Sequence, residues 1–234
     1  MKALILGCSH AAGDEMYKDP TLAIDGFNKW NFGYQNSYPV LIAQQLGYRP
    51  LNYAIPGGSN DAMFRIFYEQ LDQLTPDDVV IACWTGIDRT EIWHDLDQRW
   101  LPFSQGQHTF HPIVDNEYAL SGLNSGGQIS LDSDYQTYRE QWGRYQVNLI
   151  SSKLNKLKNI LSLNNLAQHH SIPVININSF YPIKCPDYII WAANESFWDW
   201  ADRNHCNRTD WGHYFLDTHQ RFADLIVTNI KNKL

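Results

Sequence analysis

Cysteine, long apolar runs and basic charge are all scarce in this chain of 234 residues. Its four cysteines are scattered, and no two of them form a C-x-x-C pair. The spacing of His205, Cys206 and His213 matches no standard zinc motif. The sequence therefore gives no sign of a disulfide framework or of a metal site, and we expect free thiols.

No apolar run approaches the roughly 20 residues that a membrane-spanning helix needs. The apolar stretch after Lys2 ends at Gly7, which is too short for the apolar region of a signal peptide. Asp and Glu outnumber Lys and Arg by 25 to 18, and no basic stripe is visible. We therefore expect a cytoplasmic protein whose partners are neither nucleic acids nor membranes.

The sequence does contain buried strands that alternate with amphipathic helices. We predict strands at 2–7, 50–55, 77–84 and 172–179, and helices at 37–48, from Ser59 onward, at 136–168 and at 216–233. The length suits a single domain that spans 1–234. The alternation predicts a three-layer α/β/α sandwich around a mostly parallel central sheet.

Two of these helices carry apolar stripes that we expect to face the sheet. Ser59 is the expected N-cap of the first. Its stripe is Met63, Ile66, Phe67, Leu71 and Leu74. The stripe of the helix at 136–168 is Val147, Ile150, Leu154, Leu157 and Leu161.

Aromatic residues are dense at about 87–135, among several histidines and a Gly/Ser-rich stretch. We assign no regular structure there and interpret the segment as an insertion in the domain. A second aromatic stretch covers 188–200. Either segment could form a lid or a pocket for an acyl group, or could belong to the core.

Three polar stretches follow the first three predicted strands. Ser9 follows the first in "LILGCSH", "PGGSN" (56–60) follows the second, and "WTGIDR" (84–89) follows the third. Because the carboxyl ends of parallel strands meet at one edge of a sheet, we expect these stretches to gather there. Ser9 at such an edge is a candidate nucleophile.

A serine hydroxyl needs a histidine to take its proton and a carboxylate to hold that histidine. The stretch "TDWGHYF" (209–215) places Asp210 three residues before His213, just ahead of the last helix. Gly212 lets the chain turn tightly between them. One short loop could then direct both side chains at Ser9.

In this order, these motifs resemble those of the SGNH hydrolases, also called GDSL-type esterases. The resemblance rests on Gly7-Cys8-Ser9, on "NYAIPGGSN" at 52–60 and on Asp210-Trp211-Gly212-His213, and it spans nearly the whole chain. It implies a flavodoxin-like fold. It also implies a catalytic triad of Ser9, His213 and Asp210, and an oxyanion hole that includes the backbone N–H groups of Ser9 and Gly57.

Two positions depart from the family's pattern. Cys8 stands in place of an Asp that has a positioning role. Gly86 stands in place of an Asn whose side chain donates to the oxyanion. Loss of one such donor typically costs about 3 kcal/mol of transition-state stabilisation. We expect Asn60 to replace this donor, with Thr85 as the second candidate.

The resemblance implies that Ser9 attacks an ester or N-acyl carbonyl and that water then releases the acyl-enzyme. This chemistry uses no metal and no organic cofactor. The expected partner is a small acyl ester or an acylated sugar, with His10, Trp84 and Thr85 as candidate substrate contacts. Two alternatives stay open: an inactive or weakly active carbohydrate-binding or accessory protein of the same fold, and an acyltransferase.

Several of these residues also have simpler explanations. Asp210 could cap the last helix, and Asn60 could help to start its own. Asp14 and Glu15 are expected on a solvated loop. The sequence leaves the acyl length, the leaving group and the oligomeric state open.

Overall fold

The computed structural model describes residues 1–22, 29–87, 89–94, 99–104, 149–180, 182–210 and 212–232. Its central sheet has four parallel strands in the order β2-β1-β3-β6. These strands are β1 (Lys2–Leu6), β2 (Arg49–Asn52), β3 (Val79–Trp84) and β6 (Val174–Asn178). A separate antiparallel hairpin consists of β4 (Arg89–His94) and β5 (Arg99–Ser104).

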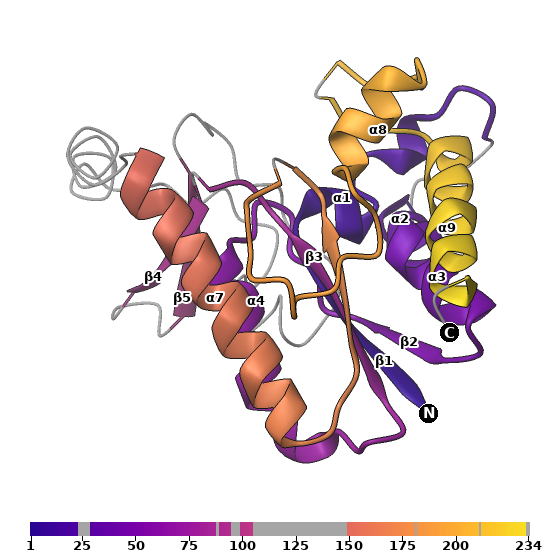
Figure 1. Cartoon of the computed structure of the whole chain (residues 1–234). Coiled ribbons are helices and arrows are strands. Elements are labelled where there is room, and N and C mark those ends of the chain that lie inside the picture. Colours follow the sequence, from indigo (N-terminus) through magenta and orange to yellow (C-terminus); the bar gives the residue numbers. More distant parts are fainter. Residues whose placement is uncertain are drawn as a thin grey trace.

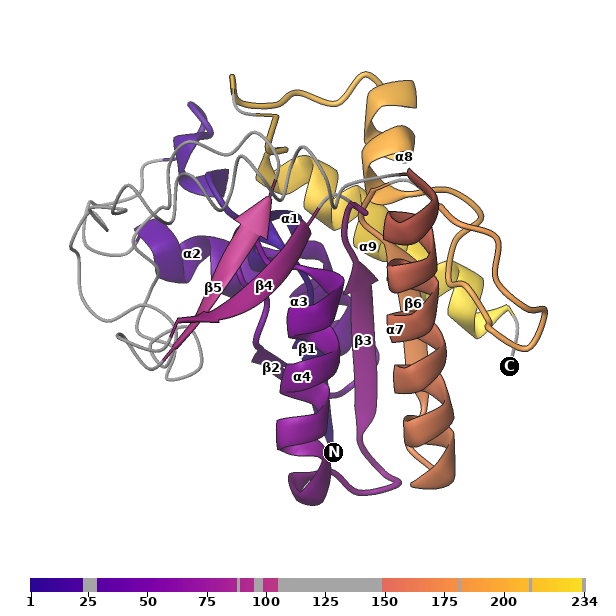
Figure 2. The same cartoon turned by 90° about the vertical axis from the view of Figure 1, so that its left-hand side faces the viewer.

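Helices cover both faces of the parallel sheet (Figures 1 and 2). Those of the described chain are α1 (Ser9–Ala12), α2 (Lys29–Asn36), α3 (Tyr38–Gln45), α4 (Asn60–Gln70), α7 (Leu149–His169), α8 (Phe197–Arg203) and α9 (Leu216–Lys231), with short 3₁₀ turns at Met16–Lys18 and Leu71–Gln73. Helices α4 and α7 lie on one face, and α3 and α9 lie on the other.

Alternation along the strands builds two separate cores. In β1, Ala3 and Ile5 pack with α3 and α9, whereas Leu4 and Leu6 pack with α4 and α7. All six residues of β3 are buried, as a strand covered on both faces requires. The predicted three-layer α/β/α architecture with a parallel sheet is thereby confirmed.

The cap and stripe predicted for the helix after Ser59 are confirmed in large part. The Ser59 side chain accepts a hydrogen bond from the N–H of Ala62 at 3.0 Å. Met63, Ile66 and Phe67 are buried in the core that α4 shares with α7.

The stripe predicted for α7 is wrong at two residues, Ile150 and Leu154, whereas Leu161 packs against the core and Val147 lies outside the described residues. Ile150 and Leu154 are 74% and 60% exposed, and the buried side chains are instead Lys156, Asn159, Ile160, Leu163 and Ala167. The reason is a polar contact with α4, because Asn155 and Asn159 both donate to the carboxylate of Asp61. That contact turns a different face of α7 toward the sheet.

The hairpin β4–β5 occupies the beginning of the predicted insertion, and residues 105–148 lie outside the described residues. Of the aromatic stretch at 188–200, Phe197 and Trp200 are buried in the core on the α9 side. None of the helices described is both long and apolar enough to cross a membrane.

Candidate active site

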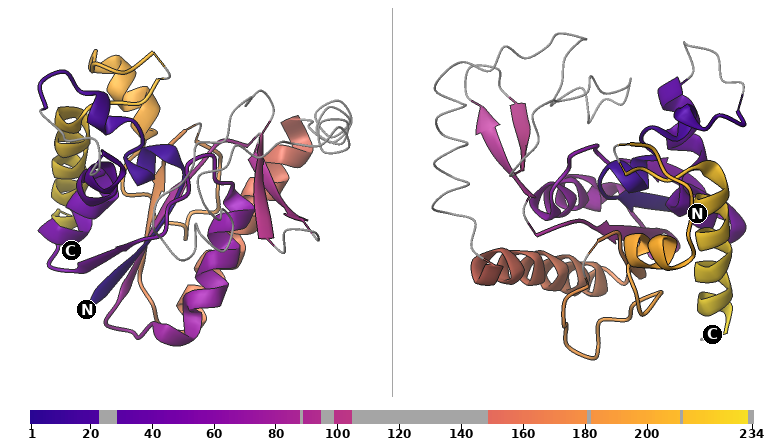
Figure 3. Two further views of the ribbon diagram at one scale, coloured as in Figure 1. Left: turned by 180° about the vertical axis from the view of Figure 1, so that it is seen from behind. Right: turned by 90° about the horizontal axis from the view of Figure 1, so that it is seen from above.

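The carboxyl end of β1 leads directly into α1, which starts at Ser9. Gly7 makes this possible, because a Cβ at that position would lie 2.5 Å from Cβ of Ala11 and 3.0 Å from Cβ of Cys83. The short helix therefore sits directly against β3. Ser9 is 5% exposed. Helix α1, which it begins, follows the end of β1 that lies opposite the amino terminus (Figures 1 and 3).

A tight turn before α9 presents His213. Arg208 and Tyr214 form an isolated antiparallel bridge, and the N–H of Thr209 donates to the carbonyl oxygen of His213 at 2.8 Å. The backbone of Gly212 has a φ of 85°, which favours glycine. Asp210 lies in this turn and is exposed.

The carboxylate that contacts His213 belongs to Glu15. Its Oε2 is 3.1 Å from Nδ1 of His213 and accepts a hydrogen bond from the hydroxyl of Thr209 at 2.7 Å. Its Oε1 pairs with the ammonium of Lys18. The contact joins residues 198 positions apart and shows that the two ends of the chain meet at this edge of the sheet.

Glu15 is 1% exposed and stays ionised because of its partners. Burial raises the pKa of its carboxyl, but hydrogen bonds from His213, Lys18 and Thr209 outweigh burial and lower the pKa to about 2. The backbone of Glu15 has a φ of 59°, a strained conformation for a residue other than glycine. Strain of this kind is concentrated at functional sites.

This pairing fixes the role of each nitrogen in neutral His213. An ionised carboxylate only accepts hydrogen bonds, so Nδ1 must carry the proton that it donates to Glu15. The other nitrogen, Nε2, then has a free lone pair. Oδ2 of Asp14 is 3.9 Å from Nε2, which is too far for a hydrogen bond.

Within the described residues, no hydrogen bond joins Ser9 to His213 or Asp210 to His213. Ser9 and His213 still share one neighbourhood, since the ring of His10 lies 5.0 Å from the ring of His213. The expected roles of Ser9, His213 and Asp210 stay predictions. For orienting His213, Glu15 has the geometry and Asp210 does not.

The ring of His10 is buried beside His213. It is 2% exposed and packs against the rings of Phe180, Phe197 and Trp198. Burial, with the nearby His213, His219 and Arg89, lowers the pKa of His10 well below its ordinary value. The expected substrate contact at His10 stays a prediction.

The expected oxyanion donors have different surroundings. Gly57 is buried with a φ of 76°. In the part of the chain that the structure describes, the backbone N–H groups of Ser9 and Gly57 donate to no protein acceptor. Asn60 is engaged, because its amide donates to the carbonyl of Gly86 at 3.0 Å and accepts from the N–H of Thr85 at 3.0 Å. Asn60 thus holds the loop after β3, and its oxyanion role stays a prediction.

Buried polar atoms without partners mark the same edge. Among the described residues, Nδ1 of His10, Oγ1 of Thr85 and Oδ1 of Asn178 are buried and form no hydrogen bond. His10 lies shortly after β1, Thr85 directly after β3, and Asn178 is the last residue of β6. Such atoms are uncommon in folded proteins and call for an explanation such as a binding or catalytic role.

Trp84 is fully buried, and its indole N–H donates to Oδ1 of Asn176 at 2.9 Å. The structure therefore does not support the expected substrate contact at Trp84.

Lys156 is also buried, and burial lowers its pKa to about 8, opposed by Cys185 and Cys8. A lysine within electrostatic range of the residue before Ser9 was not anticipated from the sequence.

The expectation that Asp14 and Glu15 lie on a solvated loop is wrong, since they are only 6% and 1% exposed. Gly13, with a φ of 71°, turns the chain back after α1, and tertiary contacts with Thr209 and His213 then enclose Glu15. The only feature of the sequence that could have pointed to Asp14 and Glu15 as site residues is their position shortly after Ser9. Among the residues described, no cluster of three His, Cys, Asp or Glu side chains is arranged to hold a metal ion.

Comparison with solved structures aligns the chain with an acetyl xylan esterase from the rumen bacterium Butyrivibrio proteoclasticus, at 12% sequence identity and a TM-score of 0.47. The alignment covers 99% of this chain and 64% of the esterase chain. No protein-family model matches the sequence, and neither does any curated protein.

Proposed function

We propose that the protein is a serine hydrolase that cleaves carboxylic esters or acyl groups through an acyl-enzyme. Ser9 is the nucleophile, His213 is the base and Glu15 orients His213. The observation that carries the proposal is the contact of Glu15 with Nδ1 of His213, close to the start of α1, where Ser9 lies. This contact gives His213 the tautomer that a general base needs.

In the proposed reaction, Nε2 of His213 takes the proton of the Ser9 hydroxyl as Oγ attacks the carbonyl carbon. The tetrahedral intermediate collapses, and His213 gives its proton to the leaving alcohol or amine. A water molecule, deprotonated by His213, then attacks the acyl-enzyme, and the acid is released as His213 returns the proton to Oγ of Ser9. The hydrogen bond between Ser9 and His213 forms when substrate is in place, since catalytic hydrogen bonds are often long or poorly aligned without substrate.

The oxyanion would be held by the backbone N–H groups of Ser9 and Gly57. Both are free of protein acceptors in the described structure. Asn60 could assist only by releasing a carbonyl of the loop after β3. With two donors in place of three, we expect a slow hydrolase for small activated esters.

The engaged amide of Asn60 also favours a second candidate, an accessory protein that binds a ligand at this edge without turning it over. The two candidates differ in whether Ser9 becomes acylated. Only a hydrolase or an acyltransferase forms a covalent bond at Ser9, and an added alcohol acceptor separates these two by their products.

The test is reaction of the protein with a fluorophosphonate and with p-nitrophenyl acetate. We expect a stoichiometric adduct on the peptide that contains Ser9 and a burst of p-nitrophenol. The Ser9→Ala variant should lose both. Ser151→Ala, which changes an exposed serine on α7, is the matched control. Absence of an adduct at Ser9 in a folded protein would refute the proposed hydrolase.

A further inference from the structure

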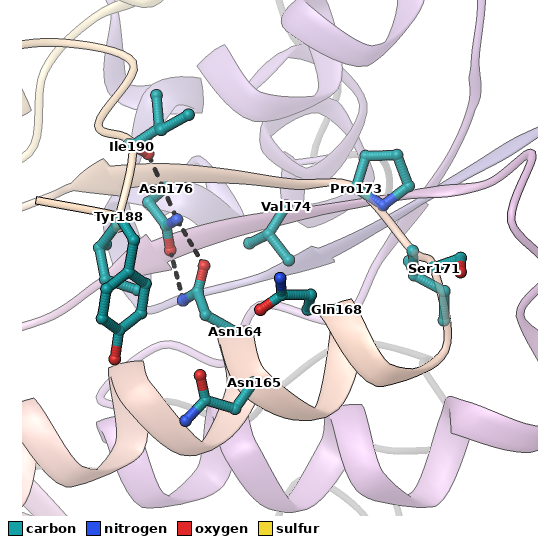
Figure 4. A pocket seen from close by; sticks show the side chains of 11 residues that line it. Asn164, Asn165, Gln168, Ser171, Pro173, Val174, Asn176, Tyr188 and Ile190 are labelled. Carbon is teal, nitrogen blue, oxygen red and sulfur yellow. Dashed lines mark hydrogen bonds between the residues drawn. The ribbon is translucent and has the colours of Figure 1, made fainter.

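A pocket lies at the outer edge of β6 (Figure 4). It has a volume of about 550 Å³, which is in the usual range for small-molecule sites. Its walls come from the last two turns of α7, from the chain that enters β6, and from the segment 188–190. Strand β3 separates β6 from β1, so the pocket is distinct from the candidate active site.

The pocket exists because the sheet is incomplete at this edge. Asn176 forms an isolated parallel bridge with Trp191, and its carbonyl accepts from the N–H of Ala192 at 2.9 Å. In the described chain, no strand continues this pairing alongside Val174. The space that a fifth strand would fill is therefore open between β6 and α7.

Two amide side chains form a rigid floor. Asn164 donates to Oδ1 of Asn176 at 3.1 Å, and Asn176 donates back to Oδ1 of Asn164 at 2.9 Å (Figure 4). The indole N–H of Trp84 on β3 also donates to Oδ1 of Asn176. The amide groups of Asn164 and Asn176 donate in addition to the backbone carbonyls of Ile160 and Ile190, respectively. Oδ1 of Asn164 keeps one lone pair that a ligand can use.

The rim is polar, uncharged and open to solvent. Asn165 and Gln168 are exposed on α7, and Tyr188 is 59% exposed on the facing segment. Within the part of the chain that the structure describes, none of these three side chains has a hydrogen-bond partner. Among the described residues, no acidic or basic side chain lines the pocket, so none of them would offset the desolvation of an ionic ligand.

We propose that this pocket is a binding site for a neutral carbohydrate. Sugar hydroxyls both donate and accept hydrogen bonds, as the amides of Asn165 and Gln168 do. The exposed ring of Tyr188 supplies an apolar surface beside them for the C–H face of a sugar ring. This inference does not rest on the proposed hydrolase activity, because it uses none of the residues of that site.

The test measures binding in the Ser9→Ala protein, in which no turnover can occur. The probes are cello-, xylo- and malto-oligosaccharides, followed through the side-chain amide resonances of ¹⁵N-labelled protein. We expect at least one probe to shift the resonances of Asn165 and Gln168 in a saturable way. We expect Tyr188→Ala to weaken its binding about tenfold, while Tyr68→Ala, a matched exposed tyrosine on α4, leaves it unchanged.

Three results would overturn this inference. They are the absence of saturable shifts with every probe, binding that Tyr188→Ala does not weaken, and shifts caused by an extended uncharged peptide but by no sugar. Failure here would leave labelling of Ser9 unaffected, and failure of that labelling would leave these resonances unaffected.

Discussion

The candidate active site and the pocket at the outer edge of β6 use opposite chemistry. At the carboxyl edge of the sheet, the charged carboxylate of Glu15 contacts His213 and also pairs with the ammonium of Lys18. At the outer edge of β6, the polar side chains are neutral amides, a serine hydroxyl and a phenol. The first arrangement can move protons, whereas the second can only recognise a shape and a hydrogen-bond pattern. The comparison teaches that polarity alone does not locate the chemistry, while ionisable groups in direct contact do.

The two regions also differ in how they are held. The amides at β6 satisfy one another within one face of the fold. Glu15 depends on partners from the other end of the chain, Thr209 and His213. A buried carboxylate is costly unless it is paired, so a change in this region should be felt both in catalysis and in stability.

The largest expected effect is a loss of activity from a substitution that disrupts the candidate active site and leaves the β6 pocket intact. His213→Ala removes the proposed base and should lower kcat/KM for p-nitrophenyl acetate by about four orders of magnitude or to background. Binding of sugars at the β6 edge should not change. The exposed His169→Ala variant is the control. Retention of most of the activity by His213→Ala would contradict the assignment.

The next effect concerns the turn that brings Glu15 into place. A Cβ at Gly13 would lie 2.3 Å from the carbonyl oxygen of Gly33, and the backbone has a φ of 71°. We expect Gly13→Ala to lower the free energy of unfolding by about 3 kcal/mol, through overpacking and backbone strain. Gly47, with a φ of 82° and nothing within 4 Å of its Cβ, is the matched control.

Urea denaturation measures both glycine variants. Gly47→Ala carries the backbone penalty alone and should cost about 1 kcal/mol. Equal losses in the two variants would show that the contact between Gly13 and Gly33 does not constrain the turn.

The smallest effect is a difference in acid stability. The pKa of Glu15 is lowered from 4.5 to about 2 in the folded protein, so its ionised form stabilises the fold above pH 4.5. That contribution is lost as the pH falls from 4.5 toward 2. The difference in unfolding free energy between the wild type and Glu15→Gln should therefore be constant above pH 4.5 and shrink below it.

Glu195→Gln, which removes a partly exposed ion pair with Arg203, should show a much smaller difference. A difference for Glu15→Gln that stays constant down to pH 2 would mean that Glu15 has no special stabilisation in the folded state.

Much of the fold was accessible from the sequence because periodicity reports burial directly. Continuous apolar runs gave the strands, and Ser59 gave the start of α4. Periodicity misled at α7, where the stripe through Ile150 and Leu154 is exposed. A polar contact to Asp61 set the rotation of that helix, and such a contact has no period.

The candidate site was accessible only in part. The position of Ser9 after β1 and of His213 before α9 could be predicted from motif order. The partner of His213 could not, because Glu15 reaches it through a tertiary contact that leaves no local pattern. Asp210 was favoured because it is near in sequence, and the structure shows it exposed in the turn.

The most direct test compares Glu15→Gln with Asp210→Asn in the rate of fluorophosphonate labelling at Ser9. If Glu15 orients His213, Glu15→Gln should slow labelling by about a hundredfold or more, and Asp210→Asn should change it by no more than about twofold. The opposite order, with Asp210→Asn slow and Glu15→Gln near the wild-type rate, would contradict the account.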